Sequence, residues 1–109
     1  MTESEFLALA ESTLDEIERA FDRLFEQDIV DVECKRSGNV LEIEFVDNGS
    51  KIIVNSQAPL QEMWIAARAG GFHYKRAGDE WRNTRDNTEF FTALSDFATE
   101  QGGAPVKLK

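Results

Sequence analysis

Regularly spaced carboxylates are the side chains of this sequence best suited to chemistry. Near the N-terminus four acids recur at steps of four, three and four residues: Glu11, Asp15, Glu18 and Asp22. Four more continue the series: Glu26, Asp28, Asp31 and Glu33. Carboxylate oxygens bind Mg²⁺, Ca²⁺, Mn²⁺ and iron with little selectivity among them. These eight acids are therefore the candidate metal ligands, and we expect weak, exchangeable binding spread over several positions.

The negative charge of the chain is concentrated in the same segment. The 109 residues carry a formal charge of −9, and residues 1–33 hold eleven of the 21 acids against only Arg19 and Arg23. The rest of the chain sums to zero. Such a field attracts cations or basic protein surfaces and disfavours nucleic acid, whose phosphates need a basic patch. The residues alone leave a cation site, a docking surface and an ordinary solvated face all open.

A helix ending near residue 24 is expected to position the first four acids. Thr2 followed by Glu5 matches a capping box, which satisfies backbone N–H groups at a helix start. Apolar residues then recur at steps of three and four: Phe6, Ala10, Leu14, Ile17, Phe21 and Leu24. Each of the four acids follows one of these residues by a single position, or about 100° of rotation. The acids therefore form a ridge beside the buried stripe.

A period of two replaces the helical spacing after residue 30 and predicts strands. The alternating segments are residues 31–36, 40–46, 51–55, 72–75 and 80–83. Asp47-Asn48-Gly49 indicates a hairpin turn between two of them. Residues 62–68 fit either a helix, which Ala66-Ala67 favours, or a strand that places Trp64 outside.

A second helix is expected near the C-terminus. Asp86 with Glu89 indicates its N-terminal cap, and Gly102-Gly103 ends it. Helix, five or six strands and helix, in that order, predict a single domain over residues 1–109. Its fold class is α+β, a two-layer sandwich with both terminal helices on one face of an antiparallel sheet and solvent on the other. Trp81 and Cys34 are expected to face the core.

Composition indicates a soluble, cytoplasmic protein. No apolar run approaches the roughly 20 residues that span a bilayer, and the N-terminal residues lack the basic and apolar regions of a signal peptide. The single cysteine excludes an internal disulfide and fits a reducing compartment. Neither membrane nor nucleic acid is an expected partner. An enzyme is not expected either, because no activated nucleophile, histidine base or phosphate loop is present.

In this order of elements the chain resembles the frataxin family, most closely its bacterial branch, over essentially its whole length. The most specific stretch runs from Asn48 through NGSKIIVNSQ and Pro59-Leu60 to Trp64. The resemblance continues in Gly70-Gly71-Phe72-His73-Tyr74 and in Gly78-Asp79-Glu80-Trp81. Ser4-Glu5-Phe6 and the acidic first helix match as well.

The resemblance implies a regulator of iron–sulfur cluster assembly with an iron-binding acidic ridge on the first helix and first strand. The implied ligand is Fe²⁺ or Fe³⁺, for which other divalent cations substitute. The implied partners are a cysteine desulfurase, on which the protein docks and slows assembly when iron is plentiful, and the scaffold protein. Glu18, Asp22, Asp31 and Glu33 match the acids of the family pattern best. The basic residues Arg19 and Arg23 and the neutral Phe25 and Gln27 depart from it.

The exposed face of the sheet is the second candidate site. Trp64 is expected to project there near Asn55, Gln57 and His73, and Arg68 completes the set of candidate partner contacts. Exposed aromatic residues are enriched in interface hot spots, although a single exposed tryptophan is also ordinary. In the family the matching tryptophan lies on the sheet surface implicated in contacts within the assembly complex. His73, the only histidine, is more often structural or solvated than a metal ligand.

Two other functions compete with an iron-dependent regulator. One is an acidic protein-interaction module without physiological metal, and the other is an iron chaperone or storage protein. We expect a monomer, with iron-induced oligomers as the mark of the storage function. The only catalysis that these residues allow is a weak ferroxidase-like activity of bound iron.

Overall fold

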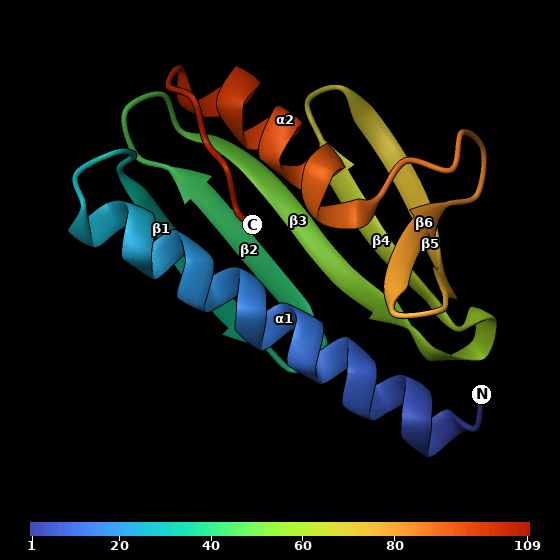
Figure 1. Ribbon diagram of the computed structural model, residues 1–109. Helices are drawn as coiled ribbons and strands as arrows, with labels where there is room; N and C mark the ends of the chain where they lie inside the picture. The colour runs from blue at the N-terminus through green and yellow to red at the C-terminus, as the bar shows by residue number, and fades with distance from the viewer.

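The computed structural model describes all 109 residues and places both helices on one face of a six-stranded antiparallel sheet (Figure 1). The elements in chain order are α1 (Glu3–Glu26), β1 (Val32–Ser37), β2 (Val40–Phe45), β3 (Ser50–Gln57), the 3₁₀ turn η1 (Ala58–Leu60), β4 (Glu62–Ala67), β5 (Gly70–Ala77), β6 (Glu80–Asn83) and α2 (Phe90–Gly102). Each strand pairs with its neighbour in sequence, so β1 and β6 are the two edges. The predicted α+β sandwich is confirmed.

Helix α1 forms as its sequence pattern predicts and extends to Glu26. The Thr2 hydroxyl accepts a hydrogen bond from the Glu5 N–H, and the Glu5 carboxylate accepts one from the Thr2 N–H. All six residues of the predicted apolar stripe are buried. Beyond the helix Asp28 adopts a positive φ of 58°, which aspartate tolerates better than most residues, and the chain turns there toward β1.

The segment that fits either a helix or a strand is strand β4. Its cross-strand partners explain this, because Ile65 lies opposite Val54 of β3 and Phe72 of β5. Pairing on both sides outweighs the helix propensity of Ala66-Ala67, so the preference for a helix there is wrong. Strand alternation buries Ile65 and places Trp64 on the outer face.

Helix α2 begins later than the Asp86 signal indicates. Asn87 has a φ of 65°, which interrupts the helix, and Glu89 is the N-cap, accepting hydrogen bonds from two backbone N–H groups of the first turn. Asp86 instead accepts a hydrogen bond from the Thr88 N–H within the preceding turn. Gly103 ends the helix with a φ of 73°, as predicted.

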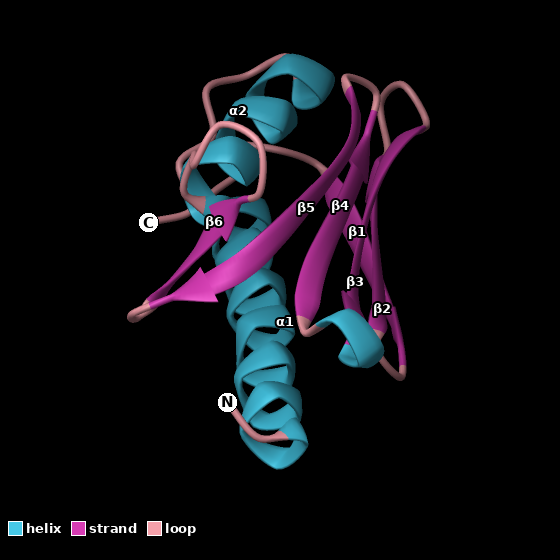
Figure 2. Ribbon diagram, turned by 90° about the vertical axis from the view of Figure 1, so that its right-hand side faces the viewer, coloured by secondary structure: helices cyan, strands magenta, loops and turns pink.

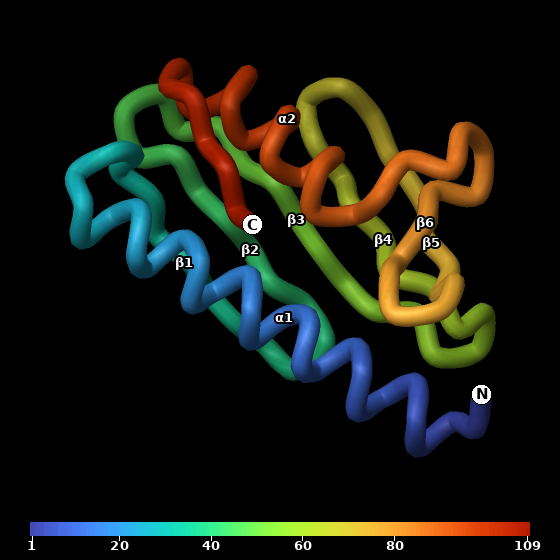
Figure 3. Tube along the Cα trace, viewed as in Figure 1, coloured from blue at the N-terminus to red at the C-terminus, as the bar shows by residue number.

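The side view shows the helices as a layer on one side of the sheet (Figure 2), and one hydrophobic core fills the space between the two layers. Trp81 belongs to it, as expected. The C-terminal tail returns between α1 and α2, where Val106 and Leu108 are buried (Figure 3). Neither helix has a stretch apolar and long enough to cross a membrane.

Candidate functional site

The predicted acidic ridge lies along α1, beside the strand β1. Its helical members are Glu11, Asp15, Glu18 and Asp22, and we keep the term acidic ridge for these four. Glu11 and Asp22 are exposed, whereas Asp15 and Glu18 are partly covered. The difference arises because a basic side chain from β1 reaches the middle of the ridge.

That side chain is Arg36, the last residue of β1 that faces the helices. Its Nη1 lies 3.0 Å from Asp15 Oδ1 and 2.8 Å from Glu18 Oε1, and its Nε donates to the Gly38 carbonyl oxygen. The arginine side chain is 22% exposed. Partial burial opposes the charged form, but the bonds to Glu18 and Asp15 outweigh it and raise the pKa of Arg36. Arg36 thus neutralises part of the ridge and fastens α1 to the edge of the sheet.

From Asp22 onward, the acids at the end of α1 and in the loop before β1 have no basic partner. Asp22, Glu26, Asp28 and Asp31 are all exposed, and none forms an ion pair. Asp28 and Asp31 line a hollow of about 300 Å³ together with Asp47 of the β2–β3 turn. We call Asp22, Glu26, Asp28 and Asp31 the open acids. They are the carboxylates most available to a cation or to a basic partner.

Glu33 is separated from the other acids by the strand that carries it. It lies opposite Glu44 in the sheet register, whereas Val32 and Cys34 face the helices. Glu33 therefore belongs to the outer face of the sheet, at its β1 edge. The structure does not bring this candidate ligand onto the helical ridge.

Metal-binding geometry is loose along the whole acidic surface. No three of the chain's His, Cys, Asp and Glu side chains gather in an arrangement that could hold a metal ion. Cys34 adds no ligand, because burial, and secondarily the charges of Asp22 and Glu18, raise its pKa to about 12. Metal binding requires the thiolate. Isolated carboxylates without a preformed cage fit weak, exchangeable cation binding.

The protected thiol of Cys34 gives a first testable prediction. At pH 8 we expect it to react with iodoacetamide at least about 100-fold more slowly than free cysteine, because so little is thiolate. The folded chain also holds this proton more tightly than the unfolded chain. Its contribution to the free energy of unfolding is therefore complete below about pH 8.5 and is lost as the pH rises toward 12.

The difference in unfolding free energy between wild type and Cys34→Ala, followed by urea denaturation, isolates the contribution of this thiol. Other buried groups titrate alike in both proteins. A difference that does not change between pH 8 and pH 10.5, or a wild-type thiol as reactive as free cysteine, contradicts the prediction.

The second candidate site lies on the outer face of the sheet, across β3 to β6. Register places its side chains in two rows: Asn55, Trp64 and His73 in one, and Gln57, Glu62, Lys75 and Arg82 in the other. We call these seven residues the outer-face array. The four sequence-predicted residues Asn55, Gln57, Trp64 and His73 therefore lie together. Arg68 does not join them, because it lies in the β4–β5 turn beyond the far end of β4.

Trp64 is fixed within the array by specific contacts. Its indole stacks on the His73 ring with a centroid separation of 4.2 Å and an interplanar angle of 10°. Its Nε1–H donates to Glu62 Oε1 at 2.8 Å. The same carboxylate oxygen lies 3.3 Å from His73 Nδ1. Trp64 is thus partly covered, and its orientation is defined by two neighbours.

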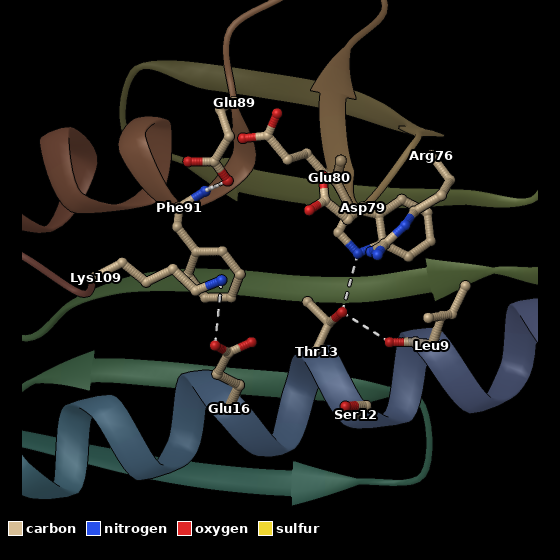
Figure 4. Close-up of a pocket in the computed structure, with 11 residues that line it drawn as sticks. Leu9, Ser12, Thr13, Glu16, Arg76, Asp79, Glu80, Glu89, Phe91 and Lys109 are labelled. Carbon is tan, nitrogen blue, oxygen red and sulfur yellow. Dashed lines mark hydrogen bonds and ion pairs between the residues drawn. The ribbon is translucent and has the colours of Figure 1, made fainter.

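A separate hollow of about 200 Å³ lies between α1, the β5–β6 hairpin and the C-terminus (Figure 4). Its charges are largely paired within the protein. Glu16 lies 3.3 Å from Lys109 Nζ, which also sits over the Phe91 ring, and Glu89 caps α2. These contacts hold Lys109 against α1 and α2. The charged groups of the hollow therefore serve mainly to pack these elements together.

Arg36 and Glu62 are the site residues that sequence reasoning missed. The alternation of the strands nevertheless indicates on which face each of the two residues lies. Arg36 shares a face with the inward-pointing Cys34, where a charged side chain needs a partner. Glu62 shares the outer face with Trp64, two residues away. The contact between Glu62 and Trp64 becomes evident only once residues 62–67 are known to form the strand β4.

Comparisons with known proteins agree with this fold over the full length. Residues 1–104 match the family described as "Frataxin-like domain". The iron-sulfur cluster assembly protein CyaY of Janthinobacterium sp. (strain Marseille) is 63% identical over 109 residues, covering 100% of this chain and 97% of that protein. The protein of the same name from Herminiimonas arsenicoxydans is 62% identical, with the same coverage.

Solved structures give the same picture. Frataxin from Psychromonas ingrahamii superimposes with a TM-score of 0.89 at 32% identity, over 100% of this chain and 99% of that one. Trimeric frataxin from the yeast Saccharomyces cerevisiae has a TM-score of 0.73 at 21% identity, over 87% and 86% of the two chains, a likeness of fold alone. The chain belongs to the frataxin-like family.

Proposed function

We propose that this protein is an iron-responsive regulator of iron–sulfur cluster assembly. The observation that carries the proposal is the set of open acids, which are exposed, free of ion pairs and part of a segment that holds the entire charge excess of −9. Relatives more than 60% identical are named iron-sulfur cluster assembly proteins, which supports the pathway. The protein acts in the cytoplasm by binding, without catalysis of its own beyond a weak ferroxidase-like activity of bound iron.

Iron binds weakly and exchangeably at the open acids. Fe²⁺ and Fe³⁺ favour carboxylate oxygens, and the lack of a convergent ligand set keeps affinity and selectivity low, so that other divalent cations substitute. A trimeric yeast frataxin is described as complexed with ferrous iron, which supports this choice of metal. Weak binding suits a protein that responds to changes in iron level better than one that holds a permanent cofactor.

The same acids dock on a basic surface of a cysteine desulfurase. Charge complementarity of this kind accelerates association and makes it sensitive to salt, while each exposed ion pair adds little affinity. The outer-face array provides a second contact, to the desulfurase or to the scaffold protein. Because iron and the desulfurase use the same carboxylates, the iron level can alter docking.

An acidic interaction module without physiological metal is the second candidate. The absence of three converging ligands favours it. Backbone NMR during anaerobic titration with ferrous iron separates the two functions. Shifts confined to residues 11–33 support metal binding, and no shifts at millimolar iron leave the interaction module. Iron-driven oligomers in gel filtration would instead indicate a storage function.

Reversing the charge of two open acids is expected to abolish the regulation of cluster assembly. Asp22→Lys with Asp31→Lys turns attraction for a basic surface into repulsion, so we expect affinity for the desulfurase to fall about tenfold or more. In a desulfurase-coupled cluster assembly assay, wild type slows assembly more at high iron than at low iron. The double variant has little effect at either level.

The matched control is Asp79→Lys with Asp96→Lys. It makes the same change in net charge at exposed positions of the β5–β6 turn and α2, outside the open acids. The control should retain binding and regulation, because overall charge alone does not create the docking surface. Unchanged desulfurase affinity in the Asp22 and Asp31 variant would refute docking through these acids.

A further inference from the structure

Glu62 is a buried carboxylate on the face of the sheet that otherwise meets solvent. Its side chain is 9% exposed, although its strand neighbours on this face are half-buried or exposed. Burying a carboxylate is costly unless hydrogen-bond donors replace the lost water. We therefore expect neighbouring side chains of the outer-face array to stabilise this carboxylate.

Three side-chain nitrogen atoms lie near this carboxylate, one from β4 and two from β5. Oε1 accepts the Trp64 Nε1–H at 2.8 Å and lies 3.3 Å from His73 Nδ1, and Oε2 lies 3.9 Å from Lys75 Nζ. The lysine contact is the weakest of the three, because it is long and the lysine side chain is 63% exposed. The short bond to the indole is therefore the main directional contact.

The indole and the imidazole share one oxygen of Glu62 and stack on each other. Register makes this possible, since Trp64 lies directly opposite His73 and two positions along β4 from Glu62. A ring held by stacking alone can still rotate about its side-chain torsions or slide. A hydrogen bond at the Nε1 edge removes that freedom, so the three side chains form one unit with a single tryptophan orientation.

Pre-orienting an aromatic side chain favours binding, because less conformational freedom is lost when a partner docks. Aromatic anchors also carry a large share of interface energy. We propose that Glu62 is a positioning residue that fixes Trp64 and His73 as a preformed contact for a protein partner. This inference rests on the proposed docking of the outer-face array, and Glu62 acts through Trp64 without needing to touch the partner.

The test compares Glu62→Gln with Glu62→Leu. Glutamine keeps an acceptor oxygen for the indole, whereas leucine keeps the volume but removes the hydrogen bond to the indole and the oxygen beside the imidazole. The first readout is the Trp64 indole N–H resonance and its hydrogen exchange, assigned against Trp64→Phe. We expect slow exchange in wild type and Glu62→Gln, and fast exchange with an upfield shift in Glu62→Leu.

The second readout is affinity for the purified complex of cysteine desulfurase and scaffold protein. We expect Glu62→Leu to weaken binding about tenfold, Trp64→Ala to weaken it at least as much, and Glu62→Gln to stay within about twofold of wild type. Glu42→Leu is the matched control, because Glu42 is another outer-face carboxylate, paired with Lys51 at 3.5 Å, that contacts no ring of the array. Circular dichroism verifies that each variant is folded.

The failures of the two proposals are distinguishable. Loss of binding in Trp64→Ala with full binding by Glu62→Leu overturns the role of Glu62 and leaves docking intact. Wild-type binding by Trp64→Ala overturns docking through the array, and the inference with it. Unchanged indole exchange in Glu62→Leu shows that another contact holds the ring, which also overturns the inference.

Discussion

Replacing Trp81 by alanine is expected to lower the free energy of unfolding by about 3–5 kcal/mol, the cost typical of a large buried aromatic side chain. Trp81 is 2% exposed and packs edge-on against Phe6 at a centroid distance of 5.9 Å. Because the native state of such a domain is stable by only about 5–15 kcal/mol, the variant should be close to unfolding at 37 °C. Urea denaturation followed by circular dichroism measures the change.

The large effect follows from the position of Trp81 between layers. Its Nε1–H donates to the Thr13 hydroxyl at 2.9 Å, and that hydroxyl donates to the Leu9 carbonyl oxygen at 2.7 Å (Figure 4). The bond joins β6 to α1 in the core. Thr13→Val removes this hydroxyl, with its bond to the Leu9 carbonyl, and leaves the indole N–H unpaired, so we expect a smaller loss of about 1–3 kcal/mol.

Trp64 is the matched control for Trp81. It lies on the outer face and is only partly buried, so Trp64→Ala should cost much less unfolding free energy while it weakens partner binding. A similar stability loss in both alanine variants would contradict the division of the two tryptophans into a core residue and a docking residue.

The main features of the fold could be predicted because they follow from local periodicity. The stripe from Phe6 to Leu24 has a single helical solution, and the turn at Asp47-Asn48-Gly49 joins two strands of clear alternation. Residues 62–67 are different. Their alternation is compatible with two structures, and only pairing with β3 and β5 decides between them. Neighbours distant in sequence overrule a local propensity here.

The candidate site was predictable as a set of residues but not as an arrangement. Spacing placed the acids of α1 beside the buried stripe, yet it could not show that Arg36, 21 residues after Asp15, occupies the middle of the ridge. The alternation of β1 already separates Glu33 from the core-facing Cys34, but only the sheet register places Glu33 opposite Glu44. Ion pairs across elements depend on side-chain reach and packing, which periodicity does not encode.

Replacing Arg36 by methionine is expected to increase the affinity of the acidic ridge for divalent cations about tenfold, because a positive charge no longer repels a cation at close range. Methionine retains much of the arginine's apolar volume, so the main change is electrostatic. Asp15 and Glu18 then become available together with Asp22. Mn²⁺ is a suitable probe, since paramagnetic broadening of backbone NMR signals reports both affinity and location.

Arg36 differs from the other arginines of this region because it is paired with two acids of the ridge, so the control is an arginine without such a pair. Arg19→Met removes the same charge from an exposed arginine of α1 that forms no ion pair. It should therefore raise Mn²⁺ affinity only about twofold, through the more negative net charge of the protein. High salt should reduce both effects, and broadening in Arg36→Met should extend from Asp22 toward Asp15. Equal affinities in the two variants would mean that net charge alone governs cation binding. A larger effect confined to Arg36→Met would instead identify this arginine as an internal competitor for the cation, which reduces the number of acids that the folded protein offers to iron.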